Sequence, residues 1–202
     1  GKNREHIVRH YNEGWAEGYF YNIQYWEIWN EPDNYPEIEL NQLWRGTMEQ
    51  YFELYETAAT YLKNRFPNLK IGGYGSCGFY AMNNVDVSNI AKSTSRTGYF
   101  IEFFHKFFQY ARDNEIPIDF FDWHTYAGLK DNILFASYPR KYLDEYGYTD
   151  CEIHVTFAFG VQPVVDIDRT DVITIDPDRP AVIGKFFLFF SHDQYSLSHN
   201  LF

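Results

Sequence analysis

Segments with helical and strand periodicity alternate from about residue 3 to residue 160, and this alternation limits the possible folds more than any other feature of the sequence. Helical spacing of apolar residues is found in 3–17, 41–66, 100–111 and 131–146. Strand-like runs cover 23–29, 69–74, 118–126 and 151–157. Strands that alternate with helices are typical of a parallel sheet in which each helix is a crossover. The sequence therefore predicts an α/β fold of about four β-α units.

The strongest helical pattern follows residue 98 and consists of aromatic residues. Its apolar positions recur at steps of three, one, three, one and three: Phe100, Phe103, Phe104, Phe107, Phe108 and Ala111. This spacing forms a broad apolar stripe, which predicts packing against the sheet rather than a ligand site. The residues before it, 79–98, are rich in Asn, Ser, Thr and Gly and predict a long loop.

Composition excludes several classes of protein. With 17 Lys plus Arg against 28 Asp plus Glu, the net charge of -11 argues against a nucleic-acid partner. An aromatic content of 21% argues against disorder. No apolar run approaches the roughly 20 residues that span a bilayer, so we expect a soluble protein without a membrane partner. Cys77 and Cys151 are too few for a disulfide framework and lack metal-type spacing. The compartment, cytoplasmic or secreted, is left open.

A carboxylic acid directly follows the first predicted strand. In the run YWEIWNEPDN, residues 25–34, Glu31 comes after an aromatic strand, with Asn30 before it and Pro32 after it. The carboxyl ends of parallel strands are where α/β proteins place reacting groups. We expect Trp26 and Trp29 to form low-dielectric walls that raise the pKa of Glu31, as a general acid at neutral pH requires. From spacing alone, a Glu that only caps the following loop is an equally good interpretation.

The string WEIWNEPDN resembles the acid/base motif of the clan A retaining glycoside hydrolases, and the surrounding chain is most similar to family 39, which includes β-xylosidases. The resemblance implies a partial (β/α)8 TIM barrel, in which Asn-Glu-Pro ends strand four and this chain spans strands four to seven. It implies that Glu31 is the acid/base and that Asn30 binds the sugar 2-hydroxyl. The implied substrate is an oligosaccharide or β-linked glycoside, and no cofactor or metal is implied.

A second segment, DFFDWHTYA at residues 119–127, resembles the sixth strand of the same clan. Strand alternation places Asp122, His124 and Tyr126 on one face. The resemblance implies that His124 shapes the sugar pocket and that Tyr126 hydrogen-bonds the nucleophile. Trp29 and Trp123 are predicted as further walls of that pocket. Without the resemblance, a satisfied buried histidine is the simpler interpretation of His124.

The expected nucleophile is missing from the sequence. A retaining glycosidase needs a second carboxylate about 5–5.5 Å from the acid, and the clan places it at the end of strand seven. Phe157 aligns best with that position, while Glu152 lies at the opposite end of the strand. Asp166 or Asp168 is a substitute only if the tail folds back over the site. We therefore expect impaired turnover; the alternatives are a non-catalytic carbohydrate-binding protein and an inactive fragment.

The resemblance ends near residue 156, and the character of the chain changes after Gly160. We expect a partial barrel domain over 1–160 and a divergent, β-rich tail over 161–202 without an assignment. The Asp residues of the tail predict turns, because the glycine and closing glutamate of an EF-hand calcium loop are absent. Four units are half of a barrel, so we expect either self-association or a missing half supplied from elsewhere.

Overall fold

The computed structural model of the chain describes residues 2–80, 96–125 and 129–156. Four predictions fall wholly or mostly outside these residues: the position of Tyr126, that of Phe157, the β-rich character of 161–202, and the long loop over 79–98, of which 81–95 lie outside.

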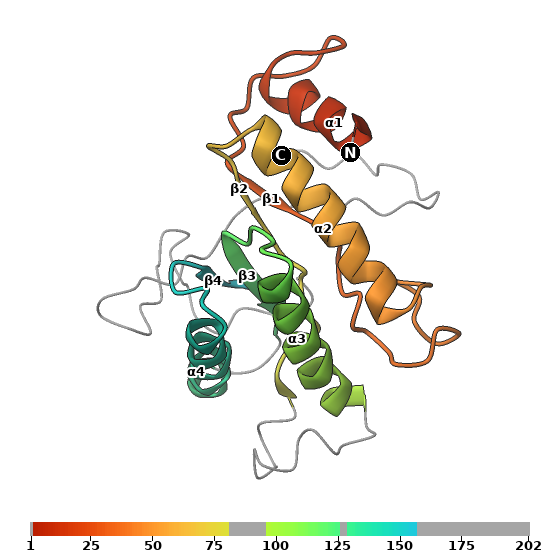
Figure 1. The fold of residues 1–202 in the computed structure, drawn as a ribbon, viewed down its shortest axis with the longest axis vertical. Coiled ribbons are helices and arrows are strands. Elements are labelled where there is room, and N and C mark those ends of the chain that lie inside the picture. Colours follow the sequence, from red (N-terminus) through yellow and green to blue (C-terminus); the bar gives the residue numbers. More distant parts are fainter. Residues whose placement is uncertain (1, 81–95, 126–128, 157–202) are drawn as a thin grey trace.

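The described chain forms one four-stranded parallel sheet with helices between the strands (Figure 1). The strands are β1 (Tyr25–Glu27), β2 (Lys70–Gly72), β3 (Phe120–His124) and β4 (Glu152–Thr156), in the spatial order β1-β2-β3-β4. The helices are α1 (Lys2–Asn12), α2 (Met48–Arg65), α3 (Arg96–Asp113) and α4 (Leu129–Glu145). Each pair of neighbouring strands is parallel, so the predicted α/β class and the four β-α units are confirmed.

The two faces of the sheet differ in chemistry because successive side chains of a strand point to opposite sides. One face joins the apolar core beneath the helices through Trp26, Ile71, Phe121, Trp123 and Ile153. The other face carries Tyr25, Glu27, Phe120, Asp122 and His154. Titratable groups are therefore concentrated on the face that is turned away from the helices.

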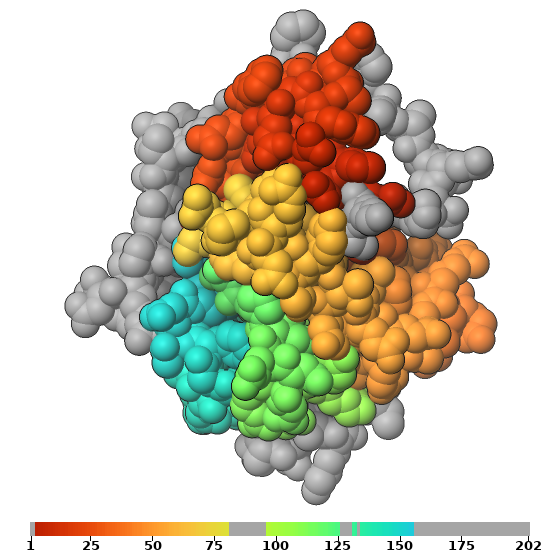
Figure 2. Space-filling model, turned by 45° about the horizontal axis from the view of Figure 1, so that its top comes forward, coloured from red at the N-terminus to blue at the C-terminus, as the bar shows by residue number. Residues whose placement is uncertain are grey.

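The phenylalanine stripe of α3 lies in the core, as its spacing predicts. All six of its apolar positions are buried, and the Phe104 ring lies 5.2 Å from that of Phe121 and 5.6 Å from that of Phe79. Figure 2 shows the helices as a continuous outer layer, in which α3 lies between α2 and α4. This layer anchors the sheet from one side and leaves its strand ends to form a site.

Three helices begin or end elsewhere than the sequence predicts. The first helix ends at Asn12 rather than continuing to residue 17. The second begins at Met48 because Thr47 caps it: the Thr47 side chain accepts from the Gln50 amide, and the Gln50 side chain accepts from the Thr47 amide. Residues 41–46, which share the apolar spacing of the helix, form a loop instead. The third begins at Arg96, inside the segment 79–98 that is predicted as a loop. Among the helices described, none is long and apolar enough to cross a membrane.

Candidate active site

The loop after β1 continues the pairing of the sheet and so fixes the position of Glu31. The Ile28 amide donates to the Gly72 carbonyl at 2.9 Å, and the Glu31 amide donates to the Gly75 carbonyl at 2.9 Å. Between these two bonds the chain turns through the left-handed region, with φ of 81° at Trp29 and 47° at Glu31. Such values are uncommon for residues other than glycine, and they turn Glu31 toward the end of β3.

The carboxyl group of Glu31 is held from both sides. Its Oε1 lies 2.6 Å from Nδ1 of His124, at the end of β3. Its Oε2 accepts a hydrogen bond from Nδ2 of Asn34 at 2.8 Å. The side chains of Glu31 and His124 are 20% and 13% exposed, so the pair is mostly shielded from water while an edge stays accessible. The structure thus joins two of the residues that the sequence singled out.

Glu31 and His124 shift each other's pKa toward the charged forms. Burial raises the pKa of Glu31, but the hydrogen bond and charge of His124, with hydrogen bonds from Cys77 and Asn34, leave this pKa below its ordinary value. Burial lowers the pKa of His124, but Glu31 and the charge of Asp122 raise it above its ordinary value. Glu31 is therefore a carboxylate at neutral pH, and its hydrogen bond to His124 favours the protonated form of that imidazole.

The predicted increase of the Glu31 pKa by tryptophan walls is therefore wrong. Trp26 alternates with Glu27 and packs in the core beneath the helices, as Trp123 does, so neither is a pocket wall. The indole of Trp29 donates to the Leu43 carbonyl at 2.9 Å and lies edge-on to Trp44.

Asn30 presents a buried acceptor next to Glu31. Its Oδ1 has no hydrogen-bond partner within the part of the chain that the structure describes. A Cβ placed on Gly75 would lie 3.5 Å from this oxygen, and Gly75 itself has φ of 58°. That distance is an ordinary contact, whereas Oε1 of Glu27 would clash with the same Cβ, so the absence of a side chain at Gly75 leaves room for the Glu27 carboxyl group.

Two further carboxyl groups lie behind Glu31 on the same face of the sheet. Glu27 of β1 and Asp122 of β3 are 3% and 0% exposed, and the Gly75 amide donates to Asp122 Oδ1 at 3.2 Å. Burial, and then the neighbouring Asp122 charge, raise the pKa of Glu27, while burial raises that of Asp122. Because two buried carboxylates repel each other, burial and this repulsion favour the protonated form of Glu27. Sequence reasoning missed Glu27, although a carboxylate between Trp26 and Ile28 is an unusual member of an apolar strand.

Asp33 is a third buried carboxyl group that sequence reasoning missed. Its Oδ2 accepts from the Ser76 hydroxyl at 2.6 Å, and its Oδ1 accepts from the Cys77 amide at 3.1 Å. Burial, with a smaller contribution from the charge of Glu31, raises the pKa of Asp33 to about 7 against the effect of these hydrogen bonds. Asp33 ties the loop after β1 to the loop after β2.

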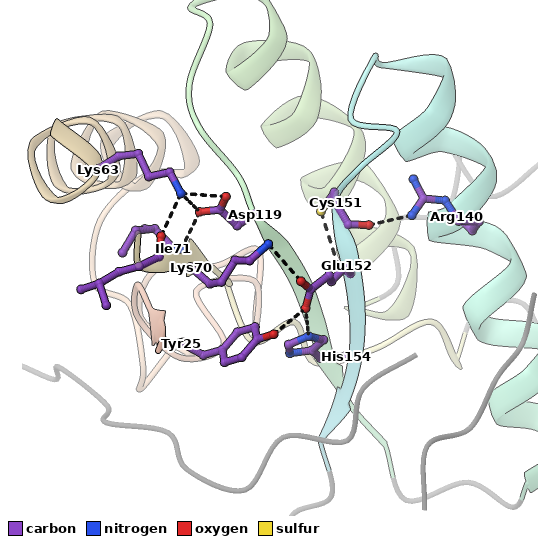
Figure 3. A network of polar contacts seen from close by, with 10 residues as sticks. Tyr25, Lys63, Lys70, Ile71, Asp119, Arg140, Cys151, Glu152 and His154 are labelled. Carbon is purple, nitrogen blue, oxygen red and sulfur yellow. Dashed lines mark hydrogen bonds and ion pairs between the residues drawn. The ribbon is translucent and has the colours of Figure 1, made fainter. Parts of the chain in front are cut away.

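Glu152 lies at the other end of the strands, as the sequence predicts. Figure 3 shows it among Tyr25, Lys70 and His154, whose polar atoms lie 2.9 Å, 3.1 Å and 3.1 Å from its carboxylate. The hydrogen bond from His154, with those from Lys70 and Tyr25, lowers its pKa to about 2 although burial opposes this. Glu152 pairs with Phe120, whereas His124 pairs with Thr156 four positions later, a separation of about 13 Å along the strand. Glu152 is a structural ion-pair partner.

The charged groups of this site do not form a metal centre. Within the described ranges, no group of three His, Cys, Asp or Glu side chains is arranged to hold a metal ion.

Comparison with known proteins places these residues in a family. The chain is 35% identical over 68 residues to a beta-xylosidase of Caldicellulosiruptor saccharolyticus, covering 34% of this chain and 12% of that protein. It superposes on the crystal structure of a glucosidase from Croceicoccus marinus with a TM-score of 0.58 and 26% identity, over 81% of this chain and 31% of that one. The chain thus spans a minor part of the length of each. The family model of the glycosyl hydrolases family 39 matches residues 4–142, which include Glu31, Asn34 and His124. The chain belongs to glycosyl hydrolases family 39, and its four β-α units are part of a TIM barrel.

Proposed function

We propose that the chain acts on β-linked glycosides, such as xylosides or β-linked oligosaccharides, with Glu31 as the acid/base of a retaining mechanism. The observation that carries this proposal is the Glu31 carboxyl group at the carboxyl end of the sheet, paired with His124 and accessible at one edge. Family membership supports a glycosidase function.

In the first step, a second carboxylate, for which the sequence offers Asp166 or Asp168 of the tail in place of Phe157, attacks the anomeric carbon and forms an ester. The bond to the leaving oxygen breaks, and Glu31 donates its proton to that oxygen. In the second step, Glu31 takes a proton from water, the water oxygen bonds to the anomeric carbon, and the ester to the enzyme breaks. Because its pKa is lowered, Glu31 is ionised at neutral pH, which suits its role as the base of the second step. For the first step, a negative charge on the nucleophile would raise the Glu31 pKa again.

Asn30, Trp29, His124 and Tyr126 complete the proposed site as substrate-binding residues. The free Oδ1 of Asn30 among the described residues supports a hydrogen bond to the sugar 2-hydroxyl. His124 contacts Glu31 directly, so a sugar that is positioned for proton transfer from Glu31 also lies next to His124.

We further propose that Phe157 at the aligned nucleophile position slows turnover. A phenyl ring can neither attack the anomeric carbon nor stabilise positive charge as a carboxylate does. Of the described carboxyl groups, Glu152 lies at the far end of the sheet, while Glu27 and Asp33 are fully buried. The division into a barrel part, 1–160, and a tail, 161–202, is part of the same proposal, as is completion of the barrel by self-association or by a missing half.

The test is hydrolysis of aryl β-xylosides and aryl β-glucosides by the chain, by Glu31→Gln and by Phe157→Glu. We expect slow release of the phenol by the wild type, none by Glu31→Gln and faster release by Phe157→Glu. Glu115→Gln, which removes an exposed carboxylate, is the matched control and leaves the rate unchanged.

Two outcomes would count against this proposal. Hydrolysis that survives Glu31→Gln would exclude Glu31 as the acid/base. Sugar binding by calorimetry without turnover in any variant would instead support a carbohydrate-binding protein. Light scattering on the same samples measures self-association.

A further inference from the structure

Arg96, the first residue of α3, forms hydrogen bonds to the loop that carries Glu31. Its Nε donates to the Asn34 carbonyl at 2.6 Å, and its Nη2 lies 3.0 Å from Asn34 Oδ1. The guanidinium also lies over two aromatic rings, 4.5 Å from the centre of Tyr35 and 5.2 Å from that of Phe100. Two hydrogen bonds and two cation-π contacts therefore hold Arg96 against Asn34, although Arg96 itself is exposed.

These contacts determine which way the Asn34 amide faces. An asparagine side chain has one acceptor and one donor group. Because Arg96 has only donors, Oδ1 has to face Arg96, and Nδ2 then faces Glu31 Oε2 at 2.8 Å. If the amide were flipped, the Nδ2 donor would face the guanidinium donors of Arg96, and the Oδ1 acceptor would face the carboxylate oxygen of Glu31. Neither pair could form a hydrogen bond. Arg96 thus makes Asn34 a donor to Glu31.

We propose that Arg96 is a positioning residue that acts through Asn34 to orient the Glu31 carboxyl group. The inference rests on the proposed function, in which Glu31 is the acid/base. With Asn34 on Oε2 and His124 on Oε1, the carboxyl group is held in one orientation before a sugar arrives. Preorganisation of this kind avoids a reorientation cost during the reaction.

Besides the Asn34 amide, several titratable groups face Glu31, and none of them is substituted in a test of Arg96. They come from three described elements and their loops: Glu27 of β1, Asp33 of the same loop, Cys77 after β2 and His124 of β3. Arg96→Gln removes a positive charge and the contact of Nη2 with Cys77 Sγ at 4.0 Å as well as the hydrogen bonds to Asn34, so the charge-preserving Arg96→Lys is the variant that reports the contribution of Asn34.

The test is a substrate-free NMR titration of the Glu31 carboxyl carbon, assigned by its loss in Glu31→Gln. Asn34→Asp keeps an acceptor for Arg96 and replaces the donor to Glu31 by a carboxylate. We expect it to raise the Glu31 midpoint by about one pH unit or more, since a like charge disfavours ionisation. Arg96→Gln should raise the midpoint by a smaller amount, because the amide is no longer held.

Arg96→Lys keeps the charge but lacks the planar fork, so we expect a midpoint between those of the wild type and Arg96→Gln. Arg112→Gln is the matched control: Arg112 is also exposed and lies 5.7 Å from the Tyr146 ring, away from Glu31, and its loss leaves the midpoint unchanged. Circular dichroism of each variant verifies that it is folded.

The proposal is overturned if folded Arg96→Lys titrates at Glu31 as the wild type does, even where Arg96→Gln is shifted, because the charge of Arg96 alone would then account for the shift. The titration needs no turnover, so its outcome is independent of the hydrolysis assay. A wild type that hydrolyses no glycoside would refute the proposed function, whereas an unshifted Glu31 midpoint in the Arg96 variants would refute only the positioning role.

Discussion

The buried carboxyl group of Asp33 makes the chain less stable as the pH rises, and Asp33→Asn isolates this effect. An asparagine keeps both contacts, because its oxygen can accept from the Cys77 amide and its NH2 can donate to the Ser76 hydroxyl. What the substitution removes is the ionisation. Any pH-dependent difference between the two proteins then comes from the Asp33 proton.

The magnitude follows from linkage between proton binding and folding. The pKa of Asp33 rises from 3.8 to about 7 on folding. Since the folded state holds the proton more tightly, the contribution of Asp33 is fully present below pH 3.8 and is lost as the pH rises through 7. A difference of about three units at 1.36 kcal/mol per unit amounts to about 4 kcal/mol.

The assay is urea unfolding of both proteins from pH 4 to pH 8, followed by tryptophan fluorescence. The free energy of unfolding of Asp33→Asn minus that of the wild type should rise by about 4 kcal/mol between pH 4 and pH 7. Above pH 7 this difference should become constant. Contributions from other titrating groups largely cancel in the difference. A gap that stays constant over this range, within about 1 kcal/mol, would refute the assignment of a raised pKa to Asp33.

Three further predictions concern stability. Phe104→Ala should lower the free energy of unfolding in urea by about 3–5 kcal/mol, whereas Phe20→Ala, at a 78% exposed side chain, should change it by less than about 0.5 kcal/mol; equal effects would contradict the described core. Thr47→Ala should cost about 1 kcal/mol by removal of the helix cap, measured by thermal unfolding in circular dichroism. The ion pairs of Glu152 contribute stability above pH 4.5 that is lost as the pH falls toward 2. Glu152→Gln should therefore make the free energy of unfolding depend less on pH between 4.5 and 2. An unchanged pH dependence in this range would argue against these ion pairs.

Local periodicity is sufficient to predict much of this fold. The spacing of the α3 phenylalanines places them in the core because a helix brings every third and fourth residue to one face. The two-residue period of β3 likewise predicts that Asp122 and His124 share a face, as the charge interaction between them indicates. The same rule also separates Trp26 from Glu27, and its use there would have removed Trp26 from the predicted pocket.

The protonation of the site depends on contacts that no local pattern contains. The pKa of Glu31 is lowered by His124, which lies 93 positions away in the chain, and nearness to tryptophan in sequence says nothing about that contact. The start of α2 is predictable from the sequence, because Thr47 three positions before Gln50 matches the capping box of a helix. The helical spacing of apolar residues, however, continues back to Leu43, so periodicity alone predicts a helix that begins too early.

The backbone bonds on either side of Glu31 also restrict how the chain can change in length. Ile28 and Glu31 donate to carbonyls that β2 and its loop hold in place. One residue inserted between them would break this match and turn the carboxyl group away from His124. Residues 36–40, by contrast, are exposed, and an insertion there would extend into solvent. Insertions and deletions in proteins that keep this site therefore have to fall outside residues 28–31, and an alignment gap within that stretch marks a site that is no longer assembled.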